Sequence, residues 1–205
     1  MKVGVLISGR GTNLKSLIDA CAADDFPAEI VLVISNKADA GGLEIARAAG
    51  IATHVVSHKN FATREEFDRA MTAKLNAADV DFVCSAGFMR ILSDEFVDAW
   101  RDRQLNIHPS LLPSFKGLNV YQRVLDAGCK VSGCTVHFVR AAMDEGPIVA
   151  QAAVPVLEDD TPETLSARIL EAEHKLYPHA LRLVAEGRVT IVDERCVIEG
   201  DTTVA

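Results

Sequence analysis

Asn106 and His108 are the two side chains of this sequence best placed to do chemistry together. They lie in the stretch LNIHPSLLP (residues 105–113), where they interrupt an otherwise apolar, strand-like run. Side chains two apart on a strand lie on the same face, and Pro109 keeps the residue before it extended. An amide N–H can donate to a developing oxyanion, and an imidazole moves a proton near neutral pH. The pair therefore predicts an acyl-transfer site.

A third polar group, Asp144, follows the apolar run GCTVHFV in the segment MDEGP. A carboxylate beside His108 would stabilise the protonated imidazole and help it donate to an acyl oxygen. The simpler alternatives are a turn aspartate, together with an asparagine and a histidine that bond to loop backbone. No serine or cysteine stands in a nucleophile elbow such as G-x-S-x-G, which favours attack by the substrate's own amine.

An anion cradle is predicted at SGRGTN (residues 8–13), between the first apolar run and a helical pattern. Glycines at 9 and 11 allow a tight turn that exposes backbone N–H groups, and a helix N-terminus adds partial positive charge. A dinucleotide fingerprint would need a third glycine near Leu14 and an acidic residue after the second strand, where the sequence is ISNKA. A single phosphate ester fits better, and the alternative is a glycine-rich turn that binds nothing.

The composition describes an acidic globular chain of 205 residues with a formal net charge of −8. This charge disfavours non-specific binding to nucleic acid or to anionic membranes. No apolar run approaches the roughly 20 residues of a membrane helix, and the N-terminus does not resemble a secretory signal, so we expect a cytoplasmic protein. The five cysteines have no C-x-x-C spacing, and the histidines form no zincin pattern. We therefore expect reduced thiols, histidines other than His108 that are satisfied or solvated, and no metal.

The elements that position these residues alternate between short β-branched runs and helical patterns. The predicted strands are residues 2–7, 29–35, 52–56, 82–86, 104–107, 133–139 and 148–156. Helical stretches of crossover length separate the first five, which predicts an α/β, doubly wound, mostly parallel sheet with a C-terminal antiparallel part. Ligands of such sheets bind beyond the carboxyl ends of the strands, where the polar motifs lie.

Capping residues support the predicted helices. Thr63 with Glu66 predicts a capping box, Ser93 precedes two acidic residues, and Thr161 stands before a proline. A long C-terminal helix follows, which Pro178 should kink or interrupt.

The motifs together resemble the glycinamide ribonucleotide formyltransferase family, the folate-dependent formyltransferases of purine biosynthesis. The matching stretches are VLISGRGTNL, ISNKADA, AGFMRIL, NIHPSLLPSFKG, GCTVHFV with Asp144 and Gly146, and EAEHKLYP, in unbroken order over residues 1 to about 192. The resemblance implies a Rossmann-like formyltransferase fold in a single domain of residues 1–205. Its parts are a phosphate-binding half (1–100), a catalytic and folate-binding half (101–192) and a tail (193–205).

The implied reaction is direct transfer of a formyl group from 10-formyltetrahydrofolate to the amine of 5-phosphoribosyl glycinamide, without a metal. The resemblance implies Asn106, His108 and Asp144 as the catalytic set. It assigns Gly11, Thr12, Asn13 and Glu173 to the ribonucleotide. The implied folate-binding residues are Arg64, Met89, Arg90, Ile91, Leu92, Asn106, Arg140, Ala141, Ala142, Met143 and Asp144. A homodimer is left open as an assembly.

One departure from the family pattern is Ala141, where an acidic residue is expected, followed by Ala142. Contacts to the pterin would then depend more on backbone groups. The competing functions are another enzyme that uses 10-formyltetrahydrofolate, such as a hydrolase or a tRNA formyltransferase, and a phosphate-binding module without catalysis. Both enzymes resemble longer chains with an added domain, and the module would not need the Asn106, His108 and Asp144 set.

Overall fold

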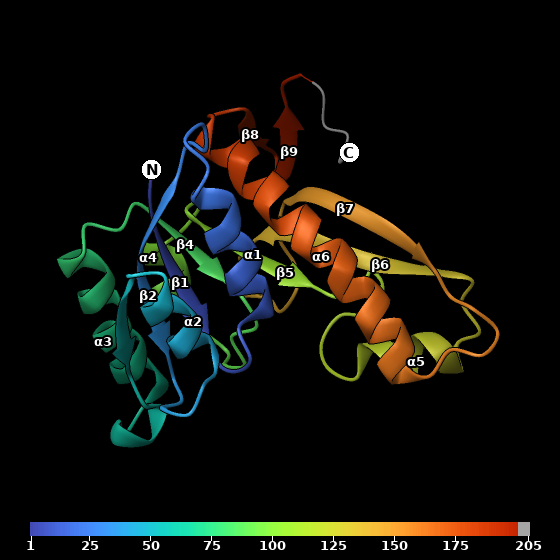
Figure 1. Cartoon of the computed structure of the whole chain (residues 1–205), viewed down its shortest axis with the longest axis horizontal. Coiled ribbons are helices and arrows are strands. Elements are labelled where there is room, and N and C mark those ends of the chain that lie inside the picture. Colours follow the sequence, from blue (N-terminus) through green and yellow to red (C-terminus); the bar gives the residue numbers. More distant parts are fainter. Residues whose placement is uncertain (201–205) are drawn as a thin grey trace. The chain divides into compact units, whose positions relative to one another are not determined.

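A mostly parallel sheet of seven strands forms the framework of the computed structural model, which describes residues 1–200 (Figure 1). The strand order is β3-β2-β1-β4-β5-β6-β7, and β8 and β9 form a separate antiparallel hairpin. The α/β fold class predicted from the sequence is therefore confirmed. The chain divides into two compact units, Met1–Asn106 and Ile107–Ala205. The predicted single domain with halves at 1–100 and 101–192 stays a prediction.

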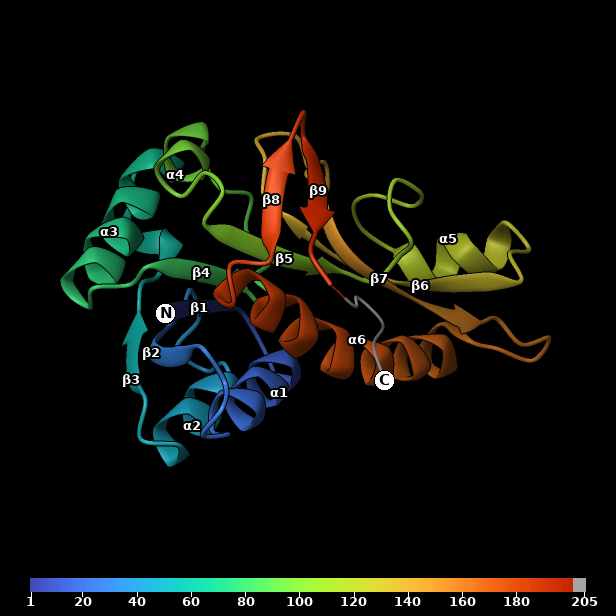
Figure 2. The same ribbon diagram turned by 90° about the horizontal axis from the view of Figure 1, so that it is seen from above.

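The first unit is built from parallel strands and crossover helices. Its elements are β1 (Lys2–Ile7), α1 (Thr12–Cys21), β2 (Glu29–Ser35), α2 (Gly42–Ala48), β3 (Ala52–Val55), the 3-10 helix η1 (His58–Asn60), α3 (Arg64–Ala77), β4 (Phe82–Ser85) and α4 (Asp94–Ala99). Figure 2 shows α1 and α2 on one face of these strands and α3 and α4 on the other. Both faces of the strands are thus covered, which explains why β1 and β4 are almost continuously apolar.

One hydrophobic core cluster of the first unit lies between the sheet and helices α3 and α4. It contains Leu6, Leu32, Ile34, Val56, Phe67, Met71, Leu75, Val80, Val83, Phe96 and Trp100. Side-chain caps start both helices: the Thr63 hydroxyl accepts from the backbone N–H of Glu66, and the Ser93 hydroxyl accepts from that of Phe96. The predicted starts of these helices are therefore confirmed.

Strand β5 (Gln104–His108) crosses the boundary between the units. The second unit continues with α5 (Val120–Asp126), β6 (Val131–Phe138), β7 (Ile148–Pro155), α6 (Pro162–Ala185), β8 (Val189–Val192) and β9 (Arg195–Ile198). Strands β6 and β7 pair antiparallel, and α6 packs against both. The predicted C-terminal antiparallel part and long helix are thus present, and the predicted strands differ from the observed ones only at their ends.

Two expectations concern the C-terminal region. Helix α6 is not interrupted at Pro178, because the buried side chains Leu176, Tyr177, Ala180 and Leu181 anchor it on both sides of the proline. The alternative expectation, a kink at Pro178, stays a prediction. The segment 193–205, predicted as a tail, contains β9, which pairs with β8 from Val192↔Arg195 to Val189↔Ile198. The last part of that segment, residues 201–205, lies outside the described residues.

Candidate active site

The SGRGTN loop has the geometry of an anion cradle. Gly11 is the N-cap of α1 and has a left-handed φ of 78°, so Thr12 and Asn13 begin the helix and are half-buried. The loop is held against α2, because the N–H of Gly42 donates to the carbonyl of Gly9 at 3.1 Å. No acidic side chain stands in the first turn of α1, so its N-terminal N–H groups face no competing carboxylate from that turn. This arrangement supports the predicted phosphate site.

Gly11→Ala is expected to weaken phosphate binding and to destabilise the first unit. A Cβ at Gly11 would overlap the Cα of Gly42, and the left-handed φ adds a strain of roughly 1–2 kcal/mol. We expect an affinity for the ribonucleotide at least about tenfold lower by calorimetry, together with a lower Tm.

Gly50→Ala is the matched control for Gly11→Ala. Gly50 has a left-handed φ of 75° but open space where a Cβ would lie. It should therefore lower Tm through backbone strain and leave the ribonucleotide affinity unchanged. Equal loss of affinity in both variants would contradict a specific role for Gly11.

The loop that carries Met89, Arg90, Ile91 and Leu92 is tied to the cradle by Ser8. The buried Ser8 hydroxyl donates to Asn36 Oδ1 at 2.7 Å and accepts from the backbone N–H of Met89 at 2.8 Å. The other end of the loop is held by Asp68, whose buried carboxylate accepts a hydrogen bond from the backbone N–H of Ser93 at 2.6 Å. Burial raises the pKa of Asp68, and the hydrogen bond to Ser93 opposes that effect.

Most side chains of this loop are exposed. Met89 and Ile91 are 68% and 59% exposed, which is unusual for large apolar residues. Arg90 is also exposed, and Leu92 is half-buried. Arg64, at the first turn of α3, is exposed and lies 3.8 Å from the carboxylate of Glu65.

Strand β5 presents Asn106 and His108 from its carboxyl end. Asn106 is half-buried and His108 is 6% exposed. His108 Nε2 lies 3.0 Å from the carbonyl oxygen of Phe115, and because a carbonyl only accepts, Nε2 carries the hydrogen. Its other ring nitrogen, Nδ1, lies 3.4 Å from Asp144 Oδ2.

Asp144 is brought to His108 by the loop between β6 and β7. Its Oδ2 accepts from the backbone N–H of Gly117 at 2.8 Å, and its backbone has a left-handed φ of 54°. Gly146 closes the base of the loop, because a Cβ there would overlap the carbonyl oxygen of Phe138. The contact between the His108 imidazole and the Asp144 carboxylate, which the sequence left open, is therefore present. Asp144 does more than stabilise its own turn, because its side chain contacts His108 and Gly117.

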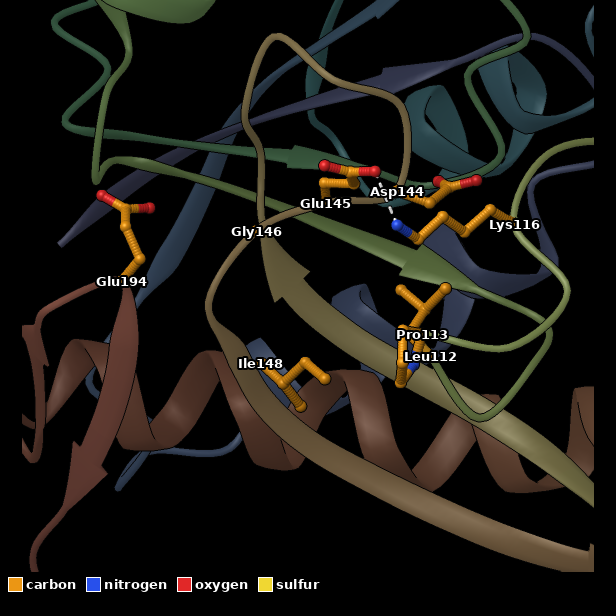
Figure 3. A pocket seen from close by; sticks show the side chains of 8 residues that line it. All are labelled: Leu112, Pro113, Lys116, Asp144, Glu145, Gly146, Ile148 and Glu194. Atoms are coloured by element: carbon orange, nitrogen blue, oxygen red, sulfur yellow. Dashed lines mark hydrogen bonds and ion pairs between the residues drawn. The ribbon is translucent and has the colours of Figure 1, made fainter.

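A cavity of about 340 Å³ opens beside this loop (Figure 3). Its lining residues are Leu112, Pro113, Lys116, Asp144, Glu145, Gly146, Ile148 and Glu194. Figure 3 shows Lys116 pointing toward Glu145, and their charged atoms lie 2.6 Å apart. Three of these side chains are carboxylates. The exposed residues Ala141, Ala142 and Met143 form the crest of the loop, with only backbone polar groups at the two alanines.

His137 is a neighbour of His108 and Asp144, although the sequence predicts no more for it than a satisfied or solvated histidine. Its Nδ1 lies 2.8 Å from the carbonyl of Phe138 and therefore carries the hydrogen. Burial lowers the pKa of His137, with His108 acting in the same direction, while the Phe138 carbonyl and Asp144 oppose the effect. The motif GCTVHFV contains this residue, but nothing in its spacing distinguishes it from a core position.

Glu173 lies at the middle of α6 and is 6% exposed. Its charge acts on Cys134 of β6: burial, and secondarily this carboxylate, raises the pKa of the Cys134 thiol to about 12. A carboxylate in so buried a position is uncommon and is a candidate for a ligand contact.

Neither a metal cluster nor a membrane helix is found between residues 1 and 200. No three His, Cys, Asp or Glu side chains of this part of the chain gather as metal ligands. None of its helices combines the length and the apolar character that crossing a membrane requires.

The chain is similar to formyltransferases along almost its full length. A sequence model of the family described as formyl transferase matches residues 1–181. The phosphoribosylglycinamide formyltransferase of Haemophilus influenzae is 46% identical over 199 residues, covering 97% of this chain and 94% of that protein. The crystal structure of glycinamide ribonucleotide transformylase 1 from Symbiobacterium toebii superposes with a TM-score of 0.95 at 50% identity, covering 97% of this chain and 93% of that one.

Longer relatives contain a similar stretch. The trifunctional purine biosynthetic protein adenosine-3 of Gallus gallus is 55% identical over 191 residues, which are 93% of this chain. The chain spans only 19% of the length of that relative.

Proposed function

Because the chain belongs to the formyl transferase family, we propose that it transfers the formyl group of 10-formyltetrahydrofolate to the amine of 5-phosphoribosyl glycinamide. Family membership confirms the resemblance predicted from the motifs. The names of the relatives that match nearly end to end support the substrate pair. The single observation that carries the proposed chemistry is the 3.4 Å approach of His108 Nδ1 to Asp144 Oδ2 at the end of the strand that also bears Asn106.

The proposed reaction is a direct acyl transfer. The substrate amine attacks the formyl carbon, which forms a C–N bond and places negative charge on the formyl oxygen. The side-chain amide of Asn106 donates to that oxygen, and so does the Nε2–H of His108 after it leaves the Phe115 carbonyl, while Asp144 at Nδ1 stabilises the imidazolium. When the bond to N10 of the folate breaks, the proton of the attacking amine passes to the leaving nitrogen. No covalent enzyme intermediate is needed.

The remaining site residues are assigned to the two substrates, the ribonucleotide and the folate. Gly11, Thr12 and Asn13 are proposed to hold the phosphate through backbone N–H groups and the helix N-terminus. Glu173 is proposed to contact the ribonucleotide at its other end. The folate is assigned to Arg64, Met89, Arg90, Ile91, Leu92, Asn106, Arg140, Ala141, Ala142, Met143 and Asp144. At Ala141 and Ala142 only backbone groups are available to the pterin.

A steady-state assay with 10-formyltetrahydrofolate tests the proposal. With 5-phosphoribosyl glycinamide we expect stoichiometric formylated product and tetrahydrofolate, whereas glycinamide without the phosphoribosyl group should react far more slowly. Formate released without an amine would indicate a hydrolase, and formylation of methionyl-tRNA would indicate a tRNA formyltransferase. Ribonucleotide binding without turnover would indicate a phosphate-binding module.

Assembly and location are proposed separately. A homodimer stays a prediction that sedimentation equilibrium of the purified chain can decide. A cytoplasmic location likewise stays a prediction, for which cell fractionation is the measurement.

A further inference from the structure

The turn of the β8–β9 hairpin carries a residue that turn chemistry does not explain. Asp193 and Glu194 connect the strands as a two-residue turn, and both have a left-handed φ, 48° and 57°. Such turns favour Asn-Gly or Asp-Gly, because glycine adopts this conformation without strain. Glutamate gains nothing from the turn itself. The role of Glu194 therefore lies in a contact that its side chain makes outside the hairpin.

That contact is a two-pronged ion pair with Arg140, 54 residues earlier in the chain. Arg140 Nε donates to Glu194 Oε2 at 2.6 Å, and Nη2 donates to Oε1 at 3.4 Å. A third bond from Nη1 to the carbonyl of Val139, at 3.0 Å, holds the guanidinium against its own backbone. The Arg140 side chain is only 10% exposed, whereas that of Glu194 is 55% exposed. The hairpin thus covers the arginine that begins the Asp144 loop.

Other contacts hold the far end of the same loop. The Asp144 carboxylate accepts from Gly117, and Glu145 pairs with Lys116. Between these contacts and Arg140 lie only Ala141, Ala142 and Met143, which are exposed. The alanines have no side chain that could fix the path of the backbone. Arg140 is therefore the anchor at the first end of the loop, and Glu194 holds that anchor.

We propose that Glu194 is a positioning residue, which through Arg140 keeps the loop of residues 140–144 in the shape that aims Asp144 at His108. Glu194 and Asp144 also line the same cavity (Figure 3), so the hairpin turn forms part of the wall beside the catalytic carboxylate. The kinetic consequence rests on the proposed function, while the structural consequence does not.

Glu194→Gln tests the kinetic consequence. Losing the charge should lower kcat and raise KM for 10-formyltetrahydrofolate, each by about fivefold, which is the factor that a partly exposed ion pair supports. KM for the ribonucleotide should stay within about twofold. The matched control is Glu158→Gln, which breaks an ion pair of 2.7 Å with Lys130, with side chains 88% and 72% exposed, and should change neither constant.

Glu194→Gly separates positioning from stability. Glycine relieves the left-handed strain at this turn but removes the carboxylate, so its Tm should be at or above that of Glu194→Gln while its kcat falls equally. A merely structural role would make activity follow Tm. In addition, the effects of Arg140→Gln and Glu194→Gln on kcat and on KM for the folate should not be additive in the double variant.

Limited trypsin digestion tests the anchor without any substrate. The bond after Arg140 precedes three exposed residues, and we expect the ion pair with Glu194 to protect it, because the Arg140 side chain is only 10% exposed. Cleavage after Arg140, followed by mass spectrometry, should be about fivefold faster in Glu194→Gln than in Glu158→Gln. Failure of the wild type to transfer formyl groups would overturn the proposed function, and the digestion would then still test whether Glu194 holds Arg140.

Cleavage at the same rate in both variants would show that Glu194 does not hold Arg140. Faster cleavage with unchanged kinetic constants, or additive effects in the double variant, would overturn the positioning role.

Discussion

His108→Ala is expected to lower kcat by about a thousandfold or more while ribonucleotide affinity stays within about twofold. The imidazole is the only group at the end of β5 that can both donate to the formyl oxygen and exchange a proton near neutral pH. The phosphate cradle contains no atom of this side chain, so binding measured by calorimetry should survive. Single-turnover rates with saturating folate report the chemical step directly.

The control for a lost histidine is His54→Ala, at an exposed position of β3. It should leave kcat, KM and Tm unchanged. The loss of the bond between His108 Nε2 and Phe115 can also lower stability, so the Tm of His108→Ala is measured alongside. A folded His108→Ala variant with turnover within about tenfold of the wild type would show that the catalytic assignment is wrong.

Asp144→Asn is expected to lower kcat by roughly a hundred- to a thousandfold without unfolding the protein. Asparagine keeps an oxygen that can accept from Gly117, and it tolerates the left-handed φ of 54° better than most residues. What it loses is the negative charge 3.4 Å from His108 Nδ1, and with it the stabilisation of the imidazolium. The readouts are kcat, and Tm within about 2 °C of the wild type.

Asp102→Asn is the matched control for Asp144→Asn, because Asp102 is an exposed aspartate with a similar φ of 57°. It should leave turnover unchanged. Combining His108→Ala with Asp144→Asn should cost little more than His108→Ala alone, since the two groups act as one unit. Multiplied losses in the double variant would mean that Asp144 acts independently of the imidazole.

Local patterns predicted the alternating elements with good accuracy. The strands Lys2–Ile7 and Glu29–Ser35 match their predicted ranges, because strands covered on both faces are continuously apolar. The caps Thr63, Ser93 and Thr161 were equally easy to identify, because a hydroxyl at the N-cap accepts from an N–H group that the first turn leaves without a backbone partner.

The β8–β9 hairpin escaped prediction because its signals are weak. Each strand has only four residues, and the turn is Asp-Glu rather than Asn-Gly. Of the two outcomes expected at Pro178, the interruption does not occur, because burial on both sides of the proline outweighs one lost backbone hydrogen bond, and the kink stays a prediction.

The sequence by itself determined the kinds of chemistry available to this protein: an amide and an imidazole two apart on a strand, a glycine loop before a helix, and no covalent nucleophile motif. These are properties of neighbouring residues, which backbone geometry places without reference to the rest of the chain. Only the tertiary structure decided which distant groups meet. Asp144 faces His108, Gly11 packs on Gly42, and Glu194 holds Arg140 because separate elements fold onto one another, and no local spacing encodes those distances.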